Sequence, residues 1–574
     1  MTQSHRIDGG QIDRSQTLKF QWNEQWMSGH PGDTLASALL ANGVKLVGRS
    51  FKYHRPRGIF SAGSEEPNAL VQLRKGAAQE PNTRATTVEL FDGLYATSQN
   101  HRGPLEWDLM AANDLLAPFL SAGFYYKTFM WPKAFWEKLY EPVIRASAGL
   151  GRLSMRPDPD VYDHGYLHCD LLIIGAGPTG LSAALTAGRA GLRVILADED
   201  FRMGGRLNAE TYEVSDRPGA DWAAGAVAEL ASMENVRLMT RTTVYGAYDH
   251  GIYGALERCT DHLATSDGKP RQVLWRLYTQ RTILSAGATE RSIAFGNNDR
   301  PGVMLAGAVR AYANRFGVAP GQQVAVFTNN EDGLRTALDL RAKGIDVTEV
   351  DARKGDRVVN TVGRKGVKSI LLASGKTVPV DCLAVSGGWS PNVALTCHHR
   401  GRPTWRDDIA GFVPAGDLPP GMTVAGAANG TMTLAACLSD GHAQAHAIAT
   451  DMGKSPASDA PTASDEAFDI TPFWHVGESK PRAWVDLQND VTAKDVKQSH
   501  QEGFRAVEHL KRYTTLGMAT DQGKTANILG LAIMAEAGGK TIPETGTTIF
   551  RPPYNPVAIG AFAGRARGKD FLSL

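Results

Sequence analysis

Two stretches of the chain alternate short apolar runs with helix-like runs in the order strand, helix, strand. The first contains the apolar run 169–174, the helical run "LSAALTAGRAGL" (181–192) and a second strand, "RVILADED" (193–200); the second occupies 322–353. Strands that alternate with helices predict a parallel sheet covered by helices. Two further segments, 281–304 and 422–445, each contain an apolar strand that ends in glycine. We therefore expect an α/β, Rossmann-like fold with two dinucleotide-binding domains.

The turn between the first strand and its helix reads GAGPTG, residues 175–180. Gly175 would permit the tight turn, Gly177 would let the backbone approach a pyrophosphate, and Gly180 would let helix and strand pack closely. Thr179 lies at the helix start, where its hydroxyl and N–H can reach a phosphate. A glycine-rich turn without a ligand is the alternative. The flanking strand and helix and the acidic residue downstream favour a dinucleotide site.

The acidic residue is Asp198, which closes the second strand and is expected to accept hydrogen bonds from ribose hydroxyls; Glu199 is the next candidate. A carboxylate there repels a 2′-phosphate, so NAD or FAD is favoured over NADP. FAD-binding relatives usually carry Asp after the glycine of the 422–445 segment, to bind the ribityl chain, but this chain has Ala427. FAD would lose a charge-assisted hydrogen bond of about 1.5–3 kcal/mol. We therefore predict NAD.

Other residues are candidates for the same cofactor. Arg206 could bind the pyrophosphate in a bidentate manner, Val244 could line the adenine slot, and Gly287 ends the strand in 281–304. Met432 and Leu434 follow Ala427 and could pack on the nicotinamide end.

The second strand–helix–strand pattern has a different turn, residues 328–333, with the sequence TNNEDG. Two of three glycines are absent, and Glu331 and Asp332 would repel phosphates. We expect a Rossmann-like domain that has lost its ligand, with a second nucleotide as the alternative. The chain also has no CxxC motif, so it lacks the dithiol of disulfide reductases.

Composition narrows the function further. The formal net charge of the 574 residues is +1, so no global field recruits nucleic acid or an anionic membrane. The five cysteines are scattered, which predicts no disulfide framework and favours a reducing cytoplasm. The sequence Cys-His-His at 397–399 is read as a polar loop, and no metal is predicted. The N-terminus is polar, without the apolar core of a signal peptide, and no apolar run approaches the ~18 residues of a membrane span. No catalytic acid or base can be nominated from spacing.

Several longer stretches carry a family resemblance. They are "GDTLASALLANGVKLVGRSFKYHRPRGIFSAGSEEPNAL" (32–70), the GAGPTG region, "AGAANGTMTLAACLSDG" (425–441), "WVDLQNDVTAKD" (484–495) and "EGFRAVEHLKRYTTLGMATDQGKTAN" (502–527). In these, and over essentially the whole chain, the sequence resembles the α subunits of heterotetrameric sarcosine oxidases.

The resemblance implies a domain plan. Residues 1–110 would form a 2Fe-2S ferredoxin-like α+β domain without its cluster, because the loop 61–68 has no cysteine where related subunits carry them. An aromatic connecting segment (111–165) would follow. The dinucleotide-binding domain would comprise 166–310 and 401–452, with a degenerate Rossmann-like domain inserted at 311–400. A linker (453–470) would lead to a small helical domain and the start of a C-terminal region (471–574).

The resemblance also implies an activity. Family complexes hold FAD in a β subunit that also carries a covalent FMN at the α–β interface, and two smaller subunits complete the assembly. The α subunit binds NAD without cycling it. The overall reaction converts sarcosine, tetrahydrofolate and oxygen into glycine, 5,10-methylenetetrahydrofolate and H2O2. The folate domain of the family does not follow before Leu574, so we expect either a fragment or a member with its domains on separate chains. The alternatives are a subunit of a related opine or secondary-amine oxidase or dehydrogenase, and a non-catalytic NAD-holding scaffold.

Two regions are candidate partner surfaces. "GKT" at 523–525 is not a P-loop, because Met518 occupies the position of the first glycine. Donors around it could instead meet a partner or the FMN phosphate: Lys511, Arg512, Thr514, Thr515, Lys524 and Thr525. A solvated loop is the alternative. The aromatic and basic stretch 123–151 could face a partner, but we expect its aromatic residues mainly to pack.

Overall fold

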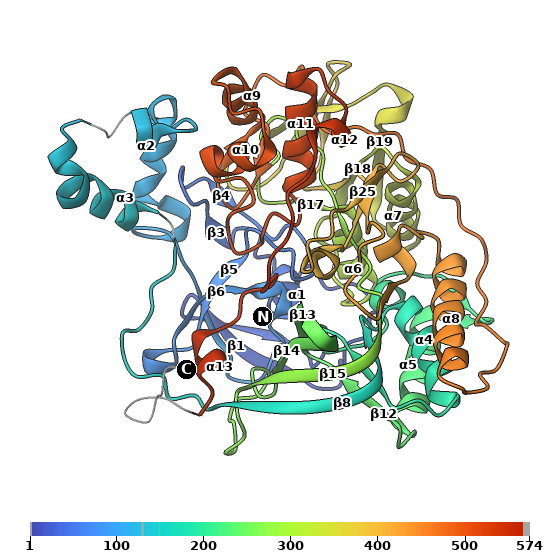
Figure 1. Cartoon of the computed structure of the whole chain (residues 1–574). Coiled ribbons are helices and arrows are strands. Elements are labelled where there is room, and N and C mark those ends of the chain that lie inside the picture. The colour runs from blue at the N-terminus through green and yellow to red at the C-terminus, as the bar shows by residue number, and fades with distance from the viewer. Residues whose placement is uncertain (1–2, 128–130, 149, 566–574) are drawn as a thin grey trace. The chain divides into compact units, whose positions relative to one another are not determined.

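The structure is a computed structural model that describes residues 3–127, 131–148 and 150–565. The chain forms two compact units (Figure 1). The first comprises Met1–Asp158, Glu290–Gly388 and Thr471–Thr548, and the second comprises Pro159–Thr289, Trp389–Ile470 and Ile549–Leu574. Residues 290–310, which we assigned to the dinucleotide-binding domain, therefore belong to the first unit, together with most of the inserted domain. Residues 389–400, assigned to the insert, belong to the second unit.

The first unit opens with a five-stranded mixed sheet in the order β2-β1-β7-β5-β6. Its strands are β1 (Leu18–Trp22), β2 (Gln25–Gly29), β5 (Leu70–Leu73), β6 (Glu80–Arg84) and β7 (Tyr95–Ser98). Phe20 and Trp22 alternate with more exposed residues along β1 and face the core. Helix α1 (Leu35–Ala41) is buried along its whole length, and a capping box between Thr34 and Ser37 fixes its start.

The loop of this domain that lacks cluster cysteines is built around a carboxylate. Glu66 is fully buried, and its oxygens accept backbone N–H groups at 2.7–3.0 Å from Phe60, Ser61, Asn68 and Ala69. Burial raises the pKa of Glu66, while the four N–H groups act in the opposite direction. A carboxyl group supplied by the chain itself therefore organises the loop.

A parallel sheet in the order β17-β23-β18-β19 forms the second part of this unit. It contains β17 (Val303–Leu305), β18 (Gln323–Thr328), β19 (Asp346–Asp351) and β23 (Cys382–Ser386), with helices α6 (Ala306–Asn314) and α7 (Glu331–Ala342). A three-stranded sheet of β20 (Val358–Val362), β21 (Ser369–Leu372) and β22 (Thr377–Pro379) accompanies it. The predicted Rossmann-like pattern at 322–353 is thus confirmed.

The third part of the unit is helical. It contains the hairpin β28 (Trp484–Asp486) and β29 (Val491–Thr492), followed by α9 (Ala493–Gln501), α10 (Val507–Thr514), α11 (Asn527–Gly538) and α12 (Ile542–Thr545). Helix α11 is apolar on all sides, and its residues from Ile528 to Ala535 are buried, which makes it the centre of this part.

The second unit is built on one large sheet in the order β12-β9-β8-β15-β14-β13, with β27 (Met422–Val424) beside β15. The other strands are β8 (Tyr162–Ile174), β9 (Val194–Ala197), β12 (Val236–Met239), β13 (Thr242–Tyr248), β14 (Ile252–Arg258) and β15 (Gln272–Leu284). Helices α4 (Pro178–Arg189), α5 (Gly219–Ala231) and α8 (Leu434–Asp451) lie together beside this sheet (Figure 1). A buried cluster of aliphatic side chains from these helices and β8, β9 and β15 forms its core.

The aromatic connecting segment is more exposed than expected. Trp131 is 85% exposed, Leu115 is 83% exposed, and Phe119, Phe135 and Leu139 expose about half of their surface or more. The expectation that these aromatic side chains mainly pack is wrong for Trp131, whereas Phe135 packs edge-on against Tyr140 with the ring centres 6.3 Å apart. The role of the segment as a partner surface stays a prediction.

Across residues 3–127, 131–148 and 150–565, we find no helix that combines the length and apolar character needed to cross a membrane.

Candidate dinucleotide-binding site

The predicted glycine turn joins β8 directly to α4, and two of its glycines are required by close contacts. Gly175 has a φ of 98°, and a Cβ there would lie 2.5 Å from the carbonyl oxygen of Ser285. A Cβ on Gly180 would lie 1.8 Å from the carbonyl oxygen of Gly175. These positions fit the turn and packing roles predicted for them.

Gly177 is different, because its surroundings are open. It is the N-cap residue of α4, and no side-chain hydrogen bond caps the helix there. A Cβ on Gly177 would meet only the Cα of Gly205, at 4.0 Å. The first N–H groups of α4 therefore lie behind a bare backbone, which is the arrangement that binds phosphate at a helix N-terminus. Gly205 has a φ of 52° and brings the second glycine pair against this turn.

Asp198 lies at the end of β9, beside the same turn. Its carboxylate accepts from the N–H of Ala176 at 2.6 Å and from the N–H of Asp200 at 2.8 Å. Burial, followed by the charge of Asp200, raises the pKa of Asp198 to about 7. Each carboxylate oxygen has a second lone pair, so the group can still accept from a ribose hydroxyl. Glu199 is exposed and accepts from the side chain of Asn555 at 3.0 Å.

The turn η12 (Gly426–Asn429), which contains Ala427, packs on the start of α4. Gly426 has a φ of 66°, and a Cβ there would lie 2.1 Å from the hydroxyl oxygen of Thr179. The Thr179 side chain therefore faces this turn. Asp440 of α8 holds the turn by accepting from the N–H of Gly426 at 2.7 Å. The sequence analysis did not identify Asp440. Its place directly before Gly441, in the predicted helix that follows the Ala427 turn, was the only available signal.

Arg206 already has carboxylate partners. It is bonded to Glu210 at 2.7–2.8 Å and to Glu466 at 3.0–3.1 Å, and it also donates to the carbonyl of Met432 at 2.9 Å. Its predicted contact with a pyrophosphate would have to compete with these bonds. Glu466 also accepts from the N–H of Leu434 at 2.8 Å, so it caps α8 and holds Arg206 at once.

The remaining cofactor candidates lie in different surroundings. Leu434 is buried in the core beside α4. Val244 is half-buried on β13 and packs against a second hydrophobic cluster of the large sheet, separate from the one beside α4. Gly287 has a φ of 68°, and a Cβ there would meet no atom within 4 Å. Contacts of these residues and of Met432 with a cofactor stay predictions.

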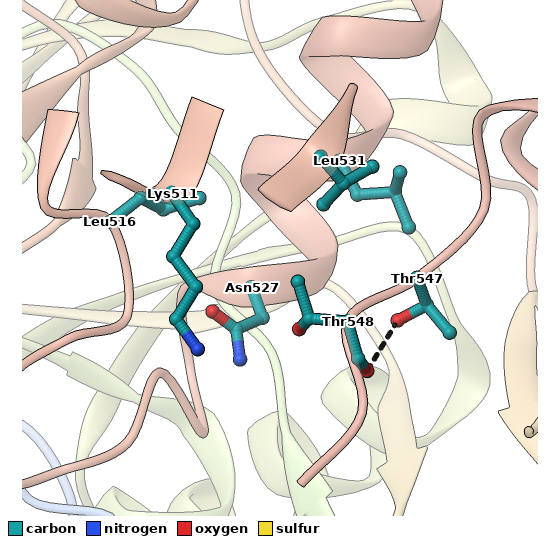
Figure 2. Close-up of a pocket in the computed structure, with 7 residues that line it drawn as sticks. Lys511, Leu516, Asn527, Leu531, Thr547 and Thr548 are labelled. Atoms are coloured by element: carbon teal, nitrogen blue, oxygen red, sulfur yellow. Dashed lines mark hydrogen bonds between the residues drawn. The ribbon is translucent and has the colours of Figure 1, made fainter. Parts of the chain in front are cut away.

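The predicted flavin-side residues lie in the first unit, around α10 and the loop that follows it. Lys511, Asn527, Thr547 and Thr548 line a hollow together with apolar side chains (Figure 2). Thr514 is buried and bonds to the carbonyl of Leu510 at 2.7 Å. Thr515 ends α10 in a left-handed conformation. Of the remaining predicted flavin-side residues, Arg512 is exposed, Lys524 is half-buried and Thr525 is buried.

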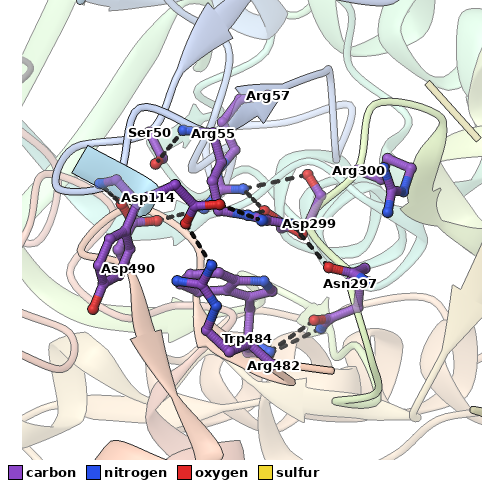
Figure 3. Close-up of polar contacts among 12 residues, drawn as sticks. Ser50, Arg55, Arg57, Asp114, Asn297, Asp299, Arg300, Arg482, Trp484 and Asp490 are labelled. Carbon is purple, nitrogen blue, oxygen red and sulfur yellow. Dashed lines mark hydrogen bonds and ion pairs between the residues drawn. The ribbon is translucent and has the colours of Figure 1, made fainter. Parts of the chain in front are cut away.

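A polar cluster fixes the helical part of this unit to the ferredoxin-like part (Figure 3). Arg57 bonds to both Asp299 and Asp490, and Arg55 bonds to Asp299 at 2.6 Å. Both guanidinium groups lie 5.2–5.3 Å from the ring centre of Trp484. Burial alone would raise the pKa of Asp299, but the two arginines hold it below its usual range. The three parts of this unit thus meet at one buried network.

Family models match three separate regions of the chain. A 2Fe-2S iron-sulfur cluster binding domain matches residues 15–101, an FAD dependent oxidoreductase model matches 170–262, and a sarcosine oxidase A3 domain matches 480–565. The expected fold class, with a ferredoxin-like N-terminal domain and a dinucleotide-binding domain, is therefore confirmed. The predicted domain bounds stay predictions.

Similar proteins extend the match along the whole chain. The chain is 49% identical over 584 residues to the sarcosine oxidase α subunit of Rhizobium meliloti (strain 1021). The aligned region covers 98% of this chain but 59% of that protein. An opine oxidase subunit of Agrobacterium tumefaciens (strain Ach5) is 24% identical, covering 69% of this chain and 91% of that protein. L-proline dehydrogenase from P. horikoshii superposes with a TM-score of 0.73 at 20% identity, over 98% of this chain and 100% of that one, which supports the fold. The predicted resemblance is confirmed: this chain is a homologue of sarcosine oxidase α subunits and spans 59% of the length of the Rhizobium meliloti protein.

Proposed function

We propose that this chain acts as the α subunit of a multi-subunit, sarcosine oxidase-type oxidoreductase and holds NAD at the N-terminus of α4. The observation that carries the NAD assignment is the uncapped, glycine-lined start of α4 beside Asp198, next to a turn whose second residue is Ala427. The N–H groups of α4 would hold the pyrophosphate, and Asp198 would accept from a ribose hydroxyl.

FAD in the same pocket is the second candidate, because the matching family model for 170–262 describes FAD dependent oxidoreductases. The chain's own residues favour NAD. The nearby acid, Asp440, is engaged by the N–H of Gly426, and Ala427 offers no side-chain acceptor to a ribityl chain. NAD needs no such acceptor.

In the proposed complex, the chemistry of amine oxidation belongs to a partner. A β subunit would carry FAD and a covalent FMN, and two smaller subunits would complete the assembly. Lys511, Thr515 and Lys524 would supply donors on the α side of the FMN. The NAD would not turn over, because we assign no acid, base or second redox group of this chain to it.

The proposed substrate is sarcosine, with glycine, H2O2 and 5,10-methylenetetrahydrofolate as products. The 49% identity to a sarcosine oxidase subunit supports this choice over an opine, for which the comparable identity is 24%. The folate step is a property we propose for the whole complex and assign to no residue of this chain. All five cysteines are free, which fits a reducing compartment, and we propose a cytoplasmic location.

The test is native purification of the tagged chain with its partners, followed by mass spectrometry of the chains and of cofactors released by acid. We expect stoichiometric NAD in this chain, flavins in a partner, and turnover of the complex with sarcosine. Stoichiometric FAD in the isolated chain, with no nicotinamide nucleotide, would overturn the cofactor assignment. Turnover with opines and none with sarcosine would overturn the substrate.

A further inference from the structure

One buried histidine connects the two ends of the aromatic connecting region. We call the described residues of 105–148 the connecting arm. His54, in the loop 50–55, is 3% exposed. Its Nδ1 lies 2.7 Å from Oδ2 of Asp108, near the start of the arm, and its Nε2 lies 3.0 Å from the carbonyl oxygen of Ser147, near the end. A single imidazole ring therefore bridges two positions that are far apart in the sequence.

Both partners of this ring can only accept a hydrogen bond. A carbonyl oxygen carries no proton, and Oδ1 of Asp108 accepts from the N–H groups of Arg102 and Met110 at 2.9 and 3.0 Å, which favours the ionised carboxylate. A neutral imidazole has one N–H, so it would leave a lone pair facing one of the two oxygens. His54 can donate to both oxygens only as an imidazolium, with a proton on each nitrogen.

His101 has surroundings in which a neutral ring is sufficient. Its Nδ1 lies 2.7 Å from the carbonyl oxygen of Gly103, and its Nε2 lies 2.9 Å from the hydroxyl oxygen of Ser98. A hydroxyl can donate as well as accept, so a neutral His101 can make both bonds. The requirement for a second proton is therefore a property of the His54 environment and does not apply to every histidine of this domain.

The other charged groups around His54 come from several parts of the chain. Asp490, between β28 and β29, adds a second negative charge to that of Asp108. Arg49 donates to the carbonyl of His54 at 3.2 Å, and its guanidinium lies in the field of Glu106 and Asp108. The imidazolium is thus surrounded by acids, and Arg49 bonds to its backbone.

The proton balance of His54 has a definite sign. Burial lowers the pKa of His54, but the hydrogen bonds to Asp108 and Ser147 and the charges of Asp108 and Asp490 outweigh burial and raise the pKa above its usual 6.5. The folded chain therefore binds this proton more tightly than the unfolded chain. The resulting stabilisation is complete below pH 6.5 and is lost as pH rises through the folded pKa.

We propose that His54 is an imidazolium that fixes both ends of the connecting arm, and that loss of its second proton at alkaline pH releases the end of α3 (Glu141–Ser147). The proton leaves from Nε2, because the bond of Nδ1 to the Asp108 carboxylate is stronger than a bond to a neutral carbonyl. The lone pair of Nε2 then faces the lone pairs of the Ser147 carbonyl, and the contact becomes repulsive.

The release of α3 has a consequence for the candidate partner surface at 123–151. The arm exposes large apolar side chains to solvent: Trp131, Leu139 and Val143. An arm that is fixed at its base holds these side chains in one arrangement, and a partner that covers them should bind less well once α3 is released. Only this consequence rests on the proposed function, because the two bonds of His54 belong to this chain alone.

The protonation of His54 can be observed in the full-length chain. NMR of protein labelled with 15N in the histidine rings distinguishes an imidazolium from the neutral tautomers, and the signal that disappears in His54→Gln identifies His54. We expect both ring nitrogens to carry protons at pH 6.5, and one of them to be lost at a higher pH. A neutral His54 ring at pH 6.5 would overturn the proposal.

The release of α3 has a separate readout, hydrogen exchange of peptides covering 136–148, corrected for the intrinsic exchange rate at each pH. We expect exchange in the wild type to be about tenfold or more faster at pH 9 than at pH 6.5, because a buried charge-assisted bond is lost. His54→Gln should exchange fast at both pH values. His101→Gln is the matched control and should behave like the wild type.

Asp108→Asn makes the test independent of any loss of folding. Its amide can donate to the neutral Nδ1, its oxygen keeps the N–H groups of Arg102 and Met110, and Nε2–H can still donate to Ser147. We therefore expect protection of α3 that no longer depends on pH. Protection that is equal at both pH values in the wild type, or an equal pH dependence in Asp108→Asn, would contradict the proposal. Partners that stay bound at pH 9 while α3 is released would contradict only the partner consequence.

Discussion

The chain has two similar strand–helix turns, one before α4 and one before α7. The first N–H groups of the helix lack a side-chain cap at α4 and have one at α7. At α4, the N-cap is Gly177, and no side chain of the described residues caps the helix. At α7, the N-cap is Asn330, whose side-chain oxygen accepts from the N–H of Gly333 at 3.0 Å. Asp332, in the first turn of α7, pairs with Arg310 at 3.0 and 3.2 Å.

This difference shows how a helix N-terminus gains or loses a ligand. Free N–H groups and the positive end of a helix attract an anion unless the chain supplies one. At α7, the Asn330 side chain accepts from one of these N–H groups and Asp332 places a negative charge in the first turn. At α4, no side chain of the described residues takes that role, and we propose that a cofactor does. Glu66 follows the α7 pattern, because its carboxylate serves N–H groups of a loop that holds a cluster in related domains. The absence of a second nucleotide stays a prediction, which the filled start of α7 supports.

The largest effect is expected from removing the charge partner at α7. Arg310→Met would remove the guanidinium nitrogen that bonds to both oxygens of the buried Asp332, beside Glu290, and would leave that carboxylate to Arg335 at 3.3 Å. Breaking a buried pair of this kind costs about 3–5 kcal/mol. Denaturant unfolding of the chain measures this loss. Arg341→Met is the matched control, because Arg341 pairs with Glu349 at the surface and should cost less than about 1 kcal/mol. Equal losses in the two variants would show that the α7 pair is not special.

Closing the start of α4 should abolish cofactor retention. Gly177→Asn would place an amide where Asn330 sits at α7, so its side chain would occupy the N–H groups and the open space. We expect nucleotide affinity to fall by about 100-fold, while the unfolding free energy stays close to that of the wild type. Nucleotide released per chain and calorimetric titration of the stripped protein measure this. The reverse change, Asn330→Gly, should leave the nucleotide content unchanged, because Glu331 and Asp332 still repel phosphate. Full retention by Gly177→Asn would place the cofactor elsewhere.

The acid cluster at α7 should also make stability depend on pH. Burial, followed by the charge of Asp332, raises the pKa of Glu290 to about 8 from its usual 4.5. The unfolded chain therefore releases this proton at a lower pH than the folded chain, and stability falls as pH rises from 4.5 to about 8. The slope from one group is at most about 1.4 kcal/mol per pH unit.

Glu290→Gln should remove that part of the slope. Unfolding curves of wild type and variant at several pH values give the difference, which cancels the contributions of Asp198 and His54. The two proteins should differ little near pH 4 and most at pH 8, where the variant should be the more stable. Parallel stability curves across this range would show that Glu290 is ionised in the folded chain.

Local sequence pattern was sufficient to predict the strand–helix turns. It was insufficient to predict which distant side chains bond to the residues around them. The glycine spacing at 175–180 and the acid at 198 lie within one strand–helix–strand unit, where periodicity and turn chemistry decide the structure. By contrast, Glu466 meets Arg206 from 260 residues away, and no local pattern indicates such a contact. The strand predicted at 169–174 in fact begins at Tyr162, because it pairs with β15 along a polar, alternating stretch that does not look like a buried strand. Domain boundaries were displaced for the same reason, since they depend on which distant segments pack together.

The smallest effect should come from the cap of α7 itself. Asn330→Ala removes the acceptor for the N–H of Gly333 and the donor to the carbonyl and hydroxyl of Ser386 at 3.3 and 3.1 Å, but leaves the pair of Arg310 and Asp332 in place. Loss of an N-cap costs about 1 kcal/mol, and loss of a hydrogen bond about 1 kcal/mol more. Chemical unfolding should therefore show a loss well below that of Arg310→Met. Added phosphate discriminates further: if the cap is the only barrier to an anion at α7, phosphate should restore the stability of Asn330→Ala. Because Asp332 and Glu331 remain at the helix start, we expect no recovery. A recovery would show that the Asn330 side chain alone, rather than the whole acidic turn, prevents an anion from binding at the start of α7.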